Sequence, residues 1–255
     1  MSSITLIEDI NDTESSQMSR FSEAVDAYEK HHTLYRLDIN NFKHAIITPE
    51  ERESRLEHNI LPFLMDNFLP SFYDVPRRRY SKMFMSSADE FEHQFGEYKY
   101  ICLIENNAKI AYIKGDFNTF SVLHKQYKVY KVIYDIMRIT AKFFASFKTY
   151  EYIRRTQLYD AEYIAEILTE IESNILDENR YAEALDYINH IKGTIVFRKF
   201  FELLYQKKDI VSALDEFLRP LRNAITVITT DKISTIPPGC EVWSEASFLA
   251  IKITD

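Results

Sequence analysis

The sequence predicts an α+β fold in which helix predominates, with helices packed around a central β-hairpin and a β-rich C-terminal segment. Apolar residues recur at spacings of three and four over much of the chain, which is typical of amphipathic helices. Two segments rich in aromatic and β-favouring residues flank Asn106-Asn107. After Pro220, short β-branched segments alternate with Pro and Gly, which favours strands.

Helices are expected in the first hundred residues from apolar spacing and capping residues. Thr48 is expected to cap a helix, because Pro49 occupies the first helical position and Glu51 completes a capping box. Ser87 with Glu90 repeats the capping box and predicts a short helix that ends at Gly96 as a left-handed cap. An earlier helix is expected over residues 16–30, where four apolar residues form one side: Met18, Phe21, Val25 and Tyr28.

The β-hairpin is expected over residues 98–104 and 109–114. Both segments are rich in aromatic and β-branched side chains. Asn106 and Asn107 between them can supply the positive φ angles of a tight turn. We therefore expect the two segments to pair with each other.

The longest helix is expected over residues 118–147. Large apolar and aromatic side chains recur along one side of this helix and form a stripe. Such a stripe serves either as a face of the core or as the interface of a homodimer, and the sequence leaves both uses open. The stripe consists of Phe120, Leu123, Tyr127, Tyr130, Tyr134, Met137 and Phe144.

The last hundred residues predict further helices and then strands. The helices are expected over residues 160–176, 178–206 and 209–219, with Asp160, Asp177 and Asp209 as N-caps and with Pro220 ending or bending the last one. The strands are expected over residues 224–229, 233–236 and 242–253.

The 255 residues suit one domain over residues 1–255, or two intimately packed lobes over about 1–117 and 118–255. Only four glycines occur, and no two are close enough to form a phosphate-binding loop, which argues against dinucleotide-binding and P-loop proteins. Cys102 and Cys240 have no zinc-binding spacing, so we expect reduced, buried thiols. No cofactor is predicted.

A cytoplasmic protein with no membrane association is expected. The N-terminal residues are acidic where a secretory signal requires a basic and then an apolar stretch. No run of 18 apolar residues occurs, so we expect no transmembrane helix.

Charge is distributed unevenly along the chain. Nine acidic residues and one basic residue lie between Asp160 and Asp186, a local charge of −8 that equals the formal charge of the whole chain. Residues 125–155, in contrast, hold eight basic and two acidic residues. The two segments could pair with each other within the fold or across a dimer, or could simply be solvated.

The acidic segment predicts a surface that binds a basic partner protein. Glu162, Glu166 and Glu170 share one helical face, where like charges repel by about 0.2 to 0.5 kcal/mol per pair, so folding alone does not favour that row. The expected activity is that of a non-enzymatic, inhibitor-like module, homo-oligomeric, that occludes the nucleic-acid-binding site of its partner. The predicted partner-binding residues are Asp160, Glu162, Glu166, Glu170, Glu172, Asp177 and Glu178.

Two alternatives remain open in the sequence. The first is nucleic-acid binding through a basic helix at residues 125–155 together with Arg77, Arg78, Arg79 and Lys82, although the net charge of −8 opposes it.

The second alternative is an enzyme with a dispersed or metal-dependent site. Glu29 with His32 and Glu90 with His93 have the Glu-x-x-His spacing of di-iron carboxylate proteins. Both pairs lie at the ends of short polar helices, whereas that architecture buries its ligands. We therefore predict no metal ligand and no catalytic residue.

Overall fold

The structure is a computed structural model that describes residues 3–6, 18–50, 60–87, 96–113, 119–128, 131–155, 160–191 and 194–253. It confirms the predominantly helical α+β class. The chain divides into two compact units, and each unit is assembled from separate segments. Unit 1 consists of Met1–Arg52, Asp74–Asn118 and Ala224–Asp255, and unit 2 of Glu53–Tyr73 and Thr119–Asn223.

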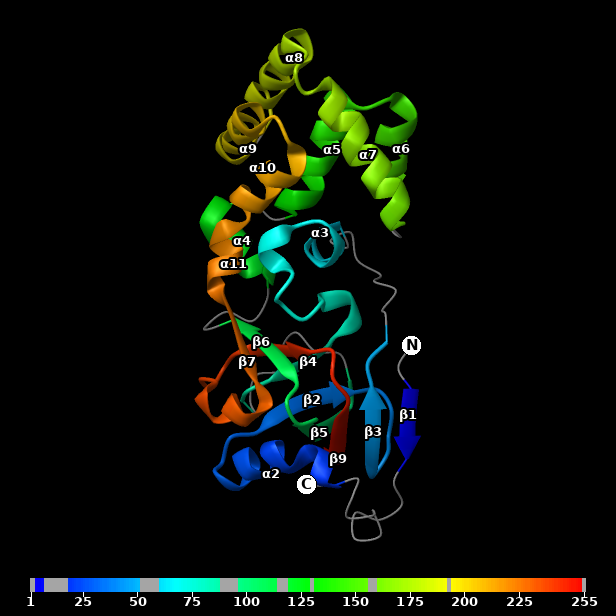
Figure 1. Cartoon of the computed structure of the whole chain (residues 1–255), viewed down its shortest axis with the longest axis vertical. Helices are drawn as coiled ribbons and strands as arrows, with labels where there is room; N and C mark the ends of the chain where they lie inside the picture. The colour runs from blue at the N-terminus through cyan, green and yellow to red at the C-terminus, as the bar shows by residue number, and fades with distance from the viewer. Residues whose placement is uncertain are drawn as a thin grey trace. The chain divides into compact units, whose positions relative to one another are not determined.

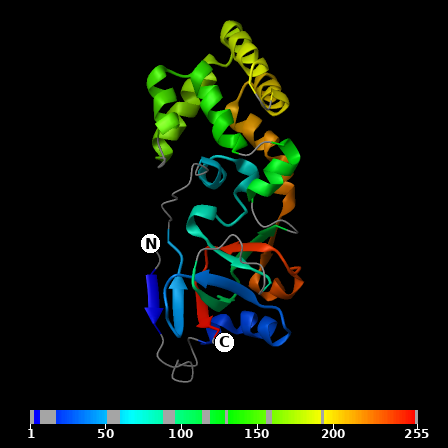
Figure 2. The same ribbon diagram turned by 180° about the vertical axis from the view of Figure 1, so that it is seen from behind.

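Unit 1 contains an antiparallel sheet whose nine described strands are ordered β1-β3-β9-β5-β2-β4-β8-β6-β7 (Figures 1 and 2). Strands distant in sequence are neighbours, since β9 pairs with both β3 and β5. The strands are β1 Ser3–Leu6, β2 Leu34–Asp38, β3 His44–Thr48, β4 Lys82–Met85, β5 Tyr98–Ile104, β6 Lys109–Ile113, β7 Ile225–Thr229, β8 Glu241–Ser244 and β9 Phe248–Lys252.

One helix and three 3₁₀ turns complete the described part of unit 1: η1 Ser19–Phe21, α2 Ser22–Glu29, η3 Arg78–Tyr80 and η4 Thr230–Thr235. Helix α2 confirms the first predicted helix. Its Ala24 and Ala27 are buried in one apolar core with Phe21 and with side chains of the sheet. Small residues let the helix approach the sheet closely.

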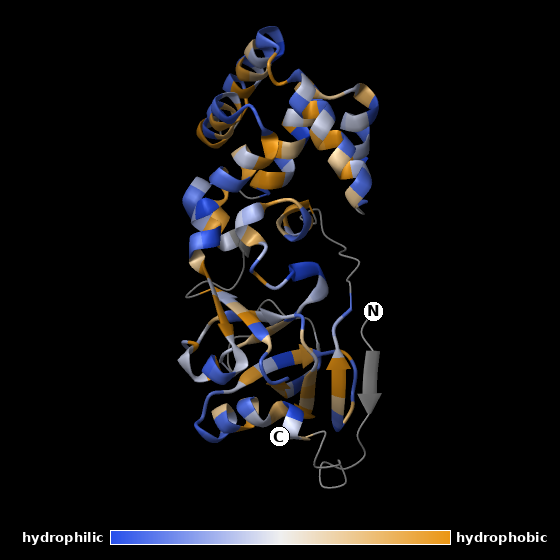
Figure 3. Ribbon diagram, in the orientation of Figure 1, coloured by the Kyte–Doolittle hydropathy of each residue, from blue (hydrophilic) through white to orange (hydrophobic). Residues whose placement is uncertain are grey.

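Unit 2 is helical throughout its described residues (Figure 1). In Figure 3 its helices are striped with apolar and polar residues, as expected where one face of a helix is buried. They are α3 Ile60–Asn67, η2 Pro70–Phe72, α4 Thr119–Tyr127, α5 Val132–Phe144, α6 Phe147–Arg155, α7 Ala161–Asn174, α8 Glu178–Asn189, α9 Thr194–Lys207, α10 Ile210–Phe217 and α11 Arg219–Ala224.

The central hairpin was predicted with the right strands and the wrong pairing. Strand β5 lies between β9 and β2, and β6 lies between β8 and β7. Asn107 does adopt a positive φ of 58°. The side chain of Asn106, however, caps α2, because its Oδ1 accepts a hydrogen bond from the Glu23 N–H at 3.0 Å. The turn therefore connects two strands that are not hydrogen-bonded to each other, with β2, β4 and β8 between them in the sheet.

The predicted long helix is also wrong, because the chain breaks there into α4, α5 and α6. Lys128 and Lys131 adopt φ angles of 59° and 58°, and this left-handed backbone ends one helix and precedes the next. Ala145 is extended and separates α5 from α6. Likewise, the helix predicted over residues 178–206 consists of α8 and α9.

Two of the three C-terminal strand predictions need correction. Strand β7 confirms the first. Residues 233–236 belong largely to the 3₁₀ turn η4 rather than to a strand. Residues 242–253 form two strands, β8 and β9, with different neighbours. Pro220 lies in the first turn of α11, so α10 ends before it, as predicted.

In the N-terminal half, the sequence did not reveal β2, β3 and β4. Thr48, predicted as a helix cap, is the last residue of β3, and most of the helix predicted after it lies outside the described residues. So does most of the helix predicted from Ser87. Gly96 serves close packing instead, because a Cβ there would lie 2.5 Å from the backbone nitrogen of Asp38.

Candidate protein-interaction site

Helix α7 presents a buried apolar face and an exposed acidic face. Asp160 caps the helix as predicted, since its carboxylate accepts hydrogen bonds from the N–H groups of Glu162 and Tyr163 at 2.9 and 3.1 Å. The buried face consists of Ile164, Ile167, Leu168 and Ile171. The exposed face carries the side chains of Glu162, Ala165, Glu166, Thr169 and Ser173.

Helix α8 repeats this arrangement. Asp177 caps it through the N–H groups of Asn179 and Arg180, and Ala184 and Ile188 are buried. The exposed face carries Glu178, Asn179, Ala182, Glu183 and Asp186. Both helices pack against α5, so their buried faces meet a common partner within unit 2.

Glu170 performs a structural task that the sequence did not reveal. Its carboxylate accepts hydrogen bonds from the Ser146 N–H at 2.7 Å and the Thr149 hydroxyl at 2.6 Å, at the start of α6. Burial raises the pKa of Glu170, but these hydrogen bonds outweigh burial and leave the pKa lowered. Glu170 therefore joins α7 to α6 and is half-buried.

Glu172 is directed to another helix start. It accepts a hydrogen bond from the backbone of Ile210, where α10 begins, and it lies beside the capping residue Asp209. Burial and then the Asp209 charge raise the pKa of Glu172. Of the seven predicted binding residues, four thus accept hydrogen bonds at helix starts: Asp160, Glu170, Glu172 and Asp177. Glu162 and Glu178 lie in the first turns of α7 and α8, and Glu166 lies one turn further along α7, but the side chains of these three accept no hydrogen bond from a described residue.

Five exposed carboxylates of α7 and α8 have no partner in the part of the chain that the structure describes. Neither a hydrogen bond nor an ion pair reaches these side chains from another described residue, whereas Arg180, the one base of the segment, pairs with Asp177 at 3.5 Å. The set with no such partner is Glu162, Glu166, Glu178, Glu183 and Asp186. We call these five residues the acidic surface.

The basic residues of 125–155 do not lie on the single basic helix that the nucleic-acid alternative expects. That helix is broken, and Arg138 pairs with Asp135 one turn away. Arg154 and Arg155 both pair with Glu151 at 2.8 and 2.6 Å. Lys142 lies 3.7 Å from the centre of the Tyr187 ring, a cation–π contact. These local contacts engage much of the positive charge.

The arginine run at residues 77–79 is similarly engaged in unit 1. Arg77 forms a two-pronged ion pair with Glu245, through Nε at 3.1 Å and Nη2 at 2.7 Å. Arg78 contacts Glu241 at 2.6 Å and lies over the Trp243 ring. These contacts hold η3 against β8 and against the turn that follows it, so this observation does not favour phosphate binding.

Four residues of the aromatic stripe of residues 120–144 belong to the core of unit 2. Leu123, Tyr127, Met137 and Phe144 are all buried within unit 2. The Tyr127 ring stacks on Phe217 at 4.2 Å between centroids, and burial raises the pKa of Tyr127 to about 12.

The structure describes one of the two Glu-x-x-His pairs and places it on the surface. Glu29 and His32 are exposed, and Glu90 and His93 lie outside the described residues. Within the described ranges, no three side chains of His, Cys, Asp or Glu form a group that would hold a metal ion.

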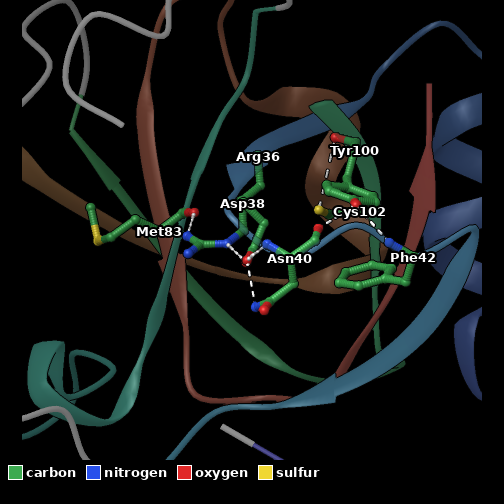
Figure 4. Close-up of polar contacts among 7 residues, drawn as sticks. All are labelled: Arg36, Asp38, Asn40, Phe42, Met83, Tyr100 and Cys102. Atoms are coloured by element: carbon green, nitrogen blue, oxygen red, sulfur yellow. Dashed lines mark hydrogen bonds and ion pairs between the residues drawn. The ribbon is translucent and has the colours of Figure 1, made fainter. Parts of the chain in front are cut away.

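A polar cluster around Asp38 is a further feature of unit 1 that the sequence did not predict (Figure 4). Asp38 accepts hydrogen bonds from the side chains of Arg36 at 3.4 Å and Asn40 at 2.9 Å. Tyr100 donates to the Asn40 carbonyl at 2.6 Å and accepts from the Phe42 N–H at 3.2 Å. These bonds fix the loop between β2 and β3, which is a structural task.

Cys102 borders this cluster on β5 (Figure 4). Burial raises the pKa of its thiol, which opposes formation of the reactive thiolate. Both cysteines are free and buried, as predicted.

The comparisons with known proteins give no further guide, since the chain matches no protein-family model, no curated protein and no solved structure. Among the helices described, none has the length and apolar character that a bilayer span requires.

Proposed function

We propose that this chain is a non-enzymatic interaction module whose acidic surface, on α7 and α8, binds a basic partner protein. One observation carries the proposal: unit 2 separates its acidic residues into two groups. Four predicted binding residues serve helix termini, and the five carboxylates of the acidic surface have no partner among the described residues.

Repulsion between two neighbouring carboxylates of α7 supports a binding role for the acidic surface. Glu162 and Glu166 lie one helical turn apart on the exposed face of α7. Such a pair costs a helix about 0.2 to 0.5 kcal/mol, and no described side chain of unit 2 pairs with either carboxylate. Lysine or arginine side chains of a partner would remove this repulsion and add ion pairs. Glu162 and Glu166 would therefore contribute favourably to the free energy of binding, although they repel each other in the free protein.

The composition of the surface narrows the class of partner. Between its carboxylates it presents Ala, Thr, Ser and Asn side chains, which form neutral hydrogen bonds at most. A partner that presents several Lys or Arg residues matches it, and proteins that bind nucleic acid have such surfaces. Occupation of that surface would exclude the nucleic acid, which is the inhibitor-like activity that we propose for a cytoplasmic protein.

The proposal is tested by capture of proteins from a lysate of the cells in which this protein occurs, followed by competition with duplex DNA. Wild-type protein, the Glu162→Lys/Glu166→Lys variant and an Asp26→Lys/Glu29→Lys control are immobilised. The control changes the net charge equally, on exposed positions of α2 in unit 1. We expect a basic protein on the wild type and the control that is absent from the α7 variant. Duplex DNA should compete with the wild type for that protein. Equal capture by all three would contradict the proposal.

A further inference from the structure

Unit 2 exposes two large apolar side chains at one end of α6 and α7. Phe147, the first residue of α6, is 79% exposed, and Leu176, shortly after the end of α7, is 63% exposed. Apolar side chains that remain in water give up the free energy that burial would supply, so a partner that covers them gains it. Leu176 directly precedes the capping residue Asp177 and is followed by Glu178 of the acidic surface.

Contacts between α6 and α7 place these two side chains at the same end of the helix pair (Figure 1). At the start of α6, the Ser146 N–H donates to Glu170 in the C-terminal half of α7. Toward the end of α6, Tyr152 contacts Tyr163 near the start of α7, with 4.3 Å between the ring centroids. The helices are therefore antiparallel, and the start of α6 and the end of α7 lie at one end of the pair.

Leu176 also completes a line of exposed residues that begins at Glu162 and follows α7. These residues recur at alternating spacings of four and three, which keeps them on one side of a helix. Ile175 retains helical angles, with φ of −60° and ψ of −28°, so Leu176 continues the line past the last residue of α7. From the helical rise per residue, the line spans about 21 Å. Its members are Glu162, Glu166, Thr169, Ser173 and Leu176.

Charge and apolar character are separated along this line. The carboxylates of Glu162 and Glu166 lie at its start, and Leu176 lies at its end, the end of the helix pair that also carries Phe147. Lys148, next to Phe147, is exposed and positive, so we expect bases of a partner over α7 and α8 and not over α6. A ligand that matches the whole line is basic along its length and apolar at one end.

We infer that the basic partner binds unit 2 through an amphipathic helix, whose Lys and Arg side chains pair with the acidic surface and whose apolar end covers Leu176 and Phe147. The inference rests on the proposed function and adds to it the form of the partner's binding segment. Helices bind other surfaces through residues at spacings of three and four, which match the spacings along α7. Charge complementarity selects a basic segment, and the two exposed apolar side chains select one that also carries apolar residues.

Two synthetic helical peptides of about 14 residues, long enough to cover about 21 Å, are the probes. Both carry Lys at spacings of three and four, and one carries two Leu residues at one end where the other carries Ala. Isothermal titration calorimetry with the wild type should give the Leu peptide at least about tenfold higher affinity. Leu176→Ala should abolish this difference. Ile39→Ala, the matched control at a 73% exposed position of unit 1, should preserve it.

The Glu162→Lys/Glu166→Lys variant separates this inference from the proposed function, because it should weaken both peptides by a similar factor. If it does, and Leu176→Ala still prefers the Leu peptide as the wild type does, this inference alone is overturned. Unchanged binding of both peptides to the charge variant would contradict the proposed function as well. No binding of the Leu peptide to the wild type, or equal affinities of the two peptides for it, would also overturn the inference.

Discussion

The carboxylate of Glu170 lies 2.6 Å from the hydroxyl of Thr149 and so ties α7 to the first turn of α6. The same carboxylate accepts the Ser146 N–H. An acidic residue that spacing alone assigns to a binding row is thus a structural residue, and its neighbour Glu166, one turn earlier, is not. This difference gives the first prediction.

Glu170→Ala should destabilise the helical unit by about 1 to 3 kcal/mol, because it leaves the buried Thr149 hydroxyl and the Ser146 N–H without their charged acceptor. Glu166→Ala, the matched control on the exposed face, should change the free energy of unfolding by no more than about 0.5 kcal/mol. Urea titration followed by far-UV circular dichroism measures both. Equal effects of the two substitutions would show that the hydrogen bonds contribute nothing.

The stabilisation by Glu170 should also depend on pH. Its pKa in the folded protein is lowered from the ordinary value of 4.5, so the folded state binds its proton more weakly than the unfolded chain. The contribution is fully present above that ordinary value and is lost as pH falls through the lowered pKa. The difference between wild type and Glu170→Ala should therefore shrink in urea titrations below about pH 4.5, and a constant difference would contradict this assignment.

The charge of Glu172 should affect the pH dependence of stability in the opposite direction from that of Glu170. Burial and the neighbouring Asp209 raise its pKa, so its charged form is unfavourable in the folded protein. The cost grows as pH rises from the ordinary value of 4.5 through the raised pKa. Glu172→Gln keeps an acceptor for the Ile210 N–H and removes the charge, so it should stabilise at neutral pH by about 0.5 kcal/mol. Glu172→Ala lacks the acceptor and should not stabilise the protein. Thermal melts of both variants at neutral and acidic pH measure this difference.

The Arg78–Glu241 pair predicts a large effect in unit 1. The side chains are 14% and 4% exposed, so removal of the arginine leaves a buried carboxylate without its charge partner. Arg78→Met should cost about 3 to 5 kcal/mol. The Arg78→Met/Glu241→Gln double variant should be more stable than the single one, because the buried negative charge is removed together with its positive partner. Urea unfolding followed by the fluorescence of Trp243, the single tryptophan, measures this, and additive losses would refute the coupling.

Local chemistry was predictable from the sequence. Asp160, Asp177 and Asp209 cap the helices that follow them, because a cap bonds to N–H groups only two or three residues along the chain. Strand β5 has the expected bounds for a similar reason, since its residue types favour extended backbone.

Long-range pairing was not predictable in this way. Asn106 has the residue type of a hairpin turn, but its side chain contacts Glu23, 83 residues away. Lys128 and Lys131 break a well-formed helical pattern without a Gly or Pro signal. Within the acidic row, Glu166 and Glu170 follow the same four-residue spacing along α7, and only the packing of α6 beside Glu170 distinguishes them. The sequence alone does not reveal where α6 packs.

Binding through the acidic surface is tested by the affinity of the captured basic protein for three forms of this chain, with melting temperatures measured on the same samples. Glu170 is left unchanged, because its substitution would confound binding with stability. Reversal of Glu162 and Glu166 to Lys should weaken binding by at least about a hundredfold and leave the melting temperature unchanged, since each interfacial ion pair contributes roughly 1.5 kcal/mol or more. The Asp26→Lys/Glu29→Lys control should retain its affinity. Equal losses in both variants, or retained affinity with a lowered melting temperature in the α7 variant, would show that Glu162 and Glu166 do not bind the partner.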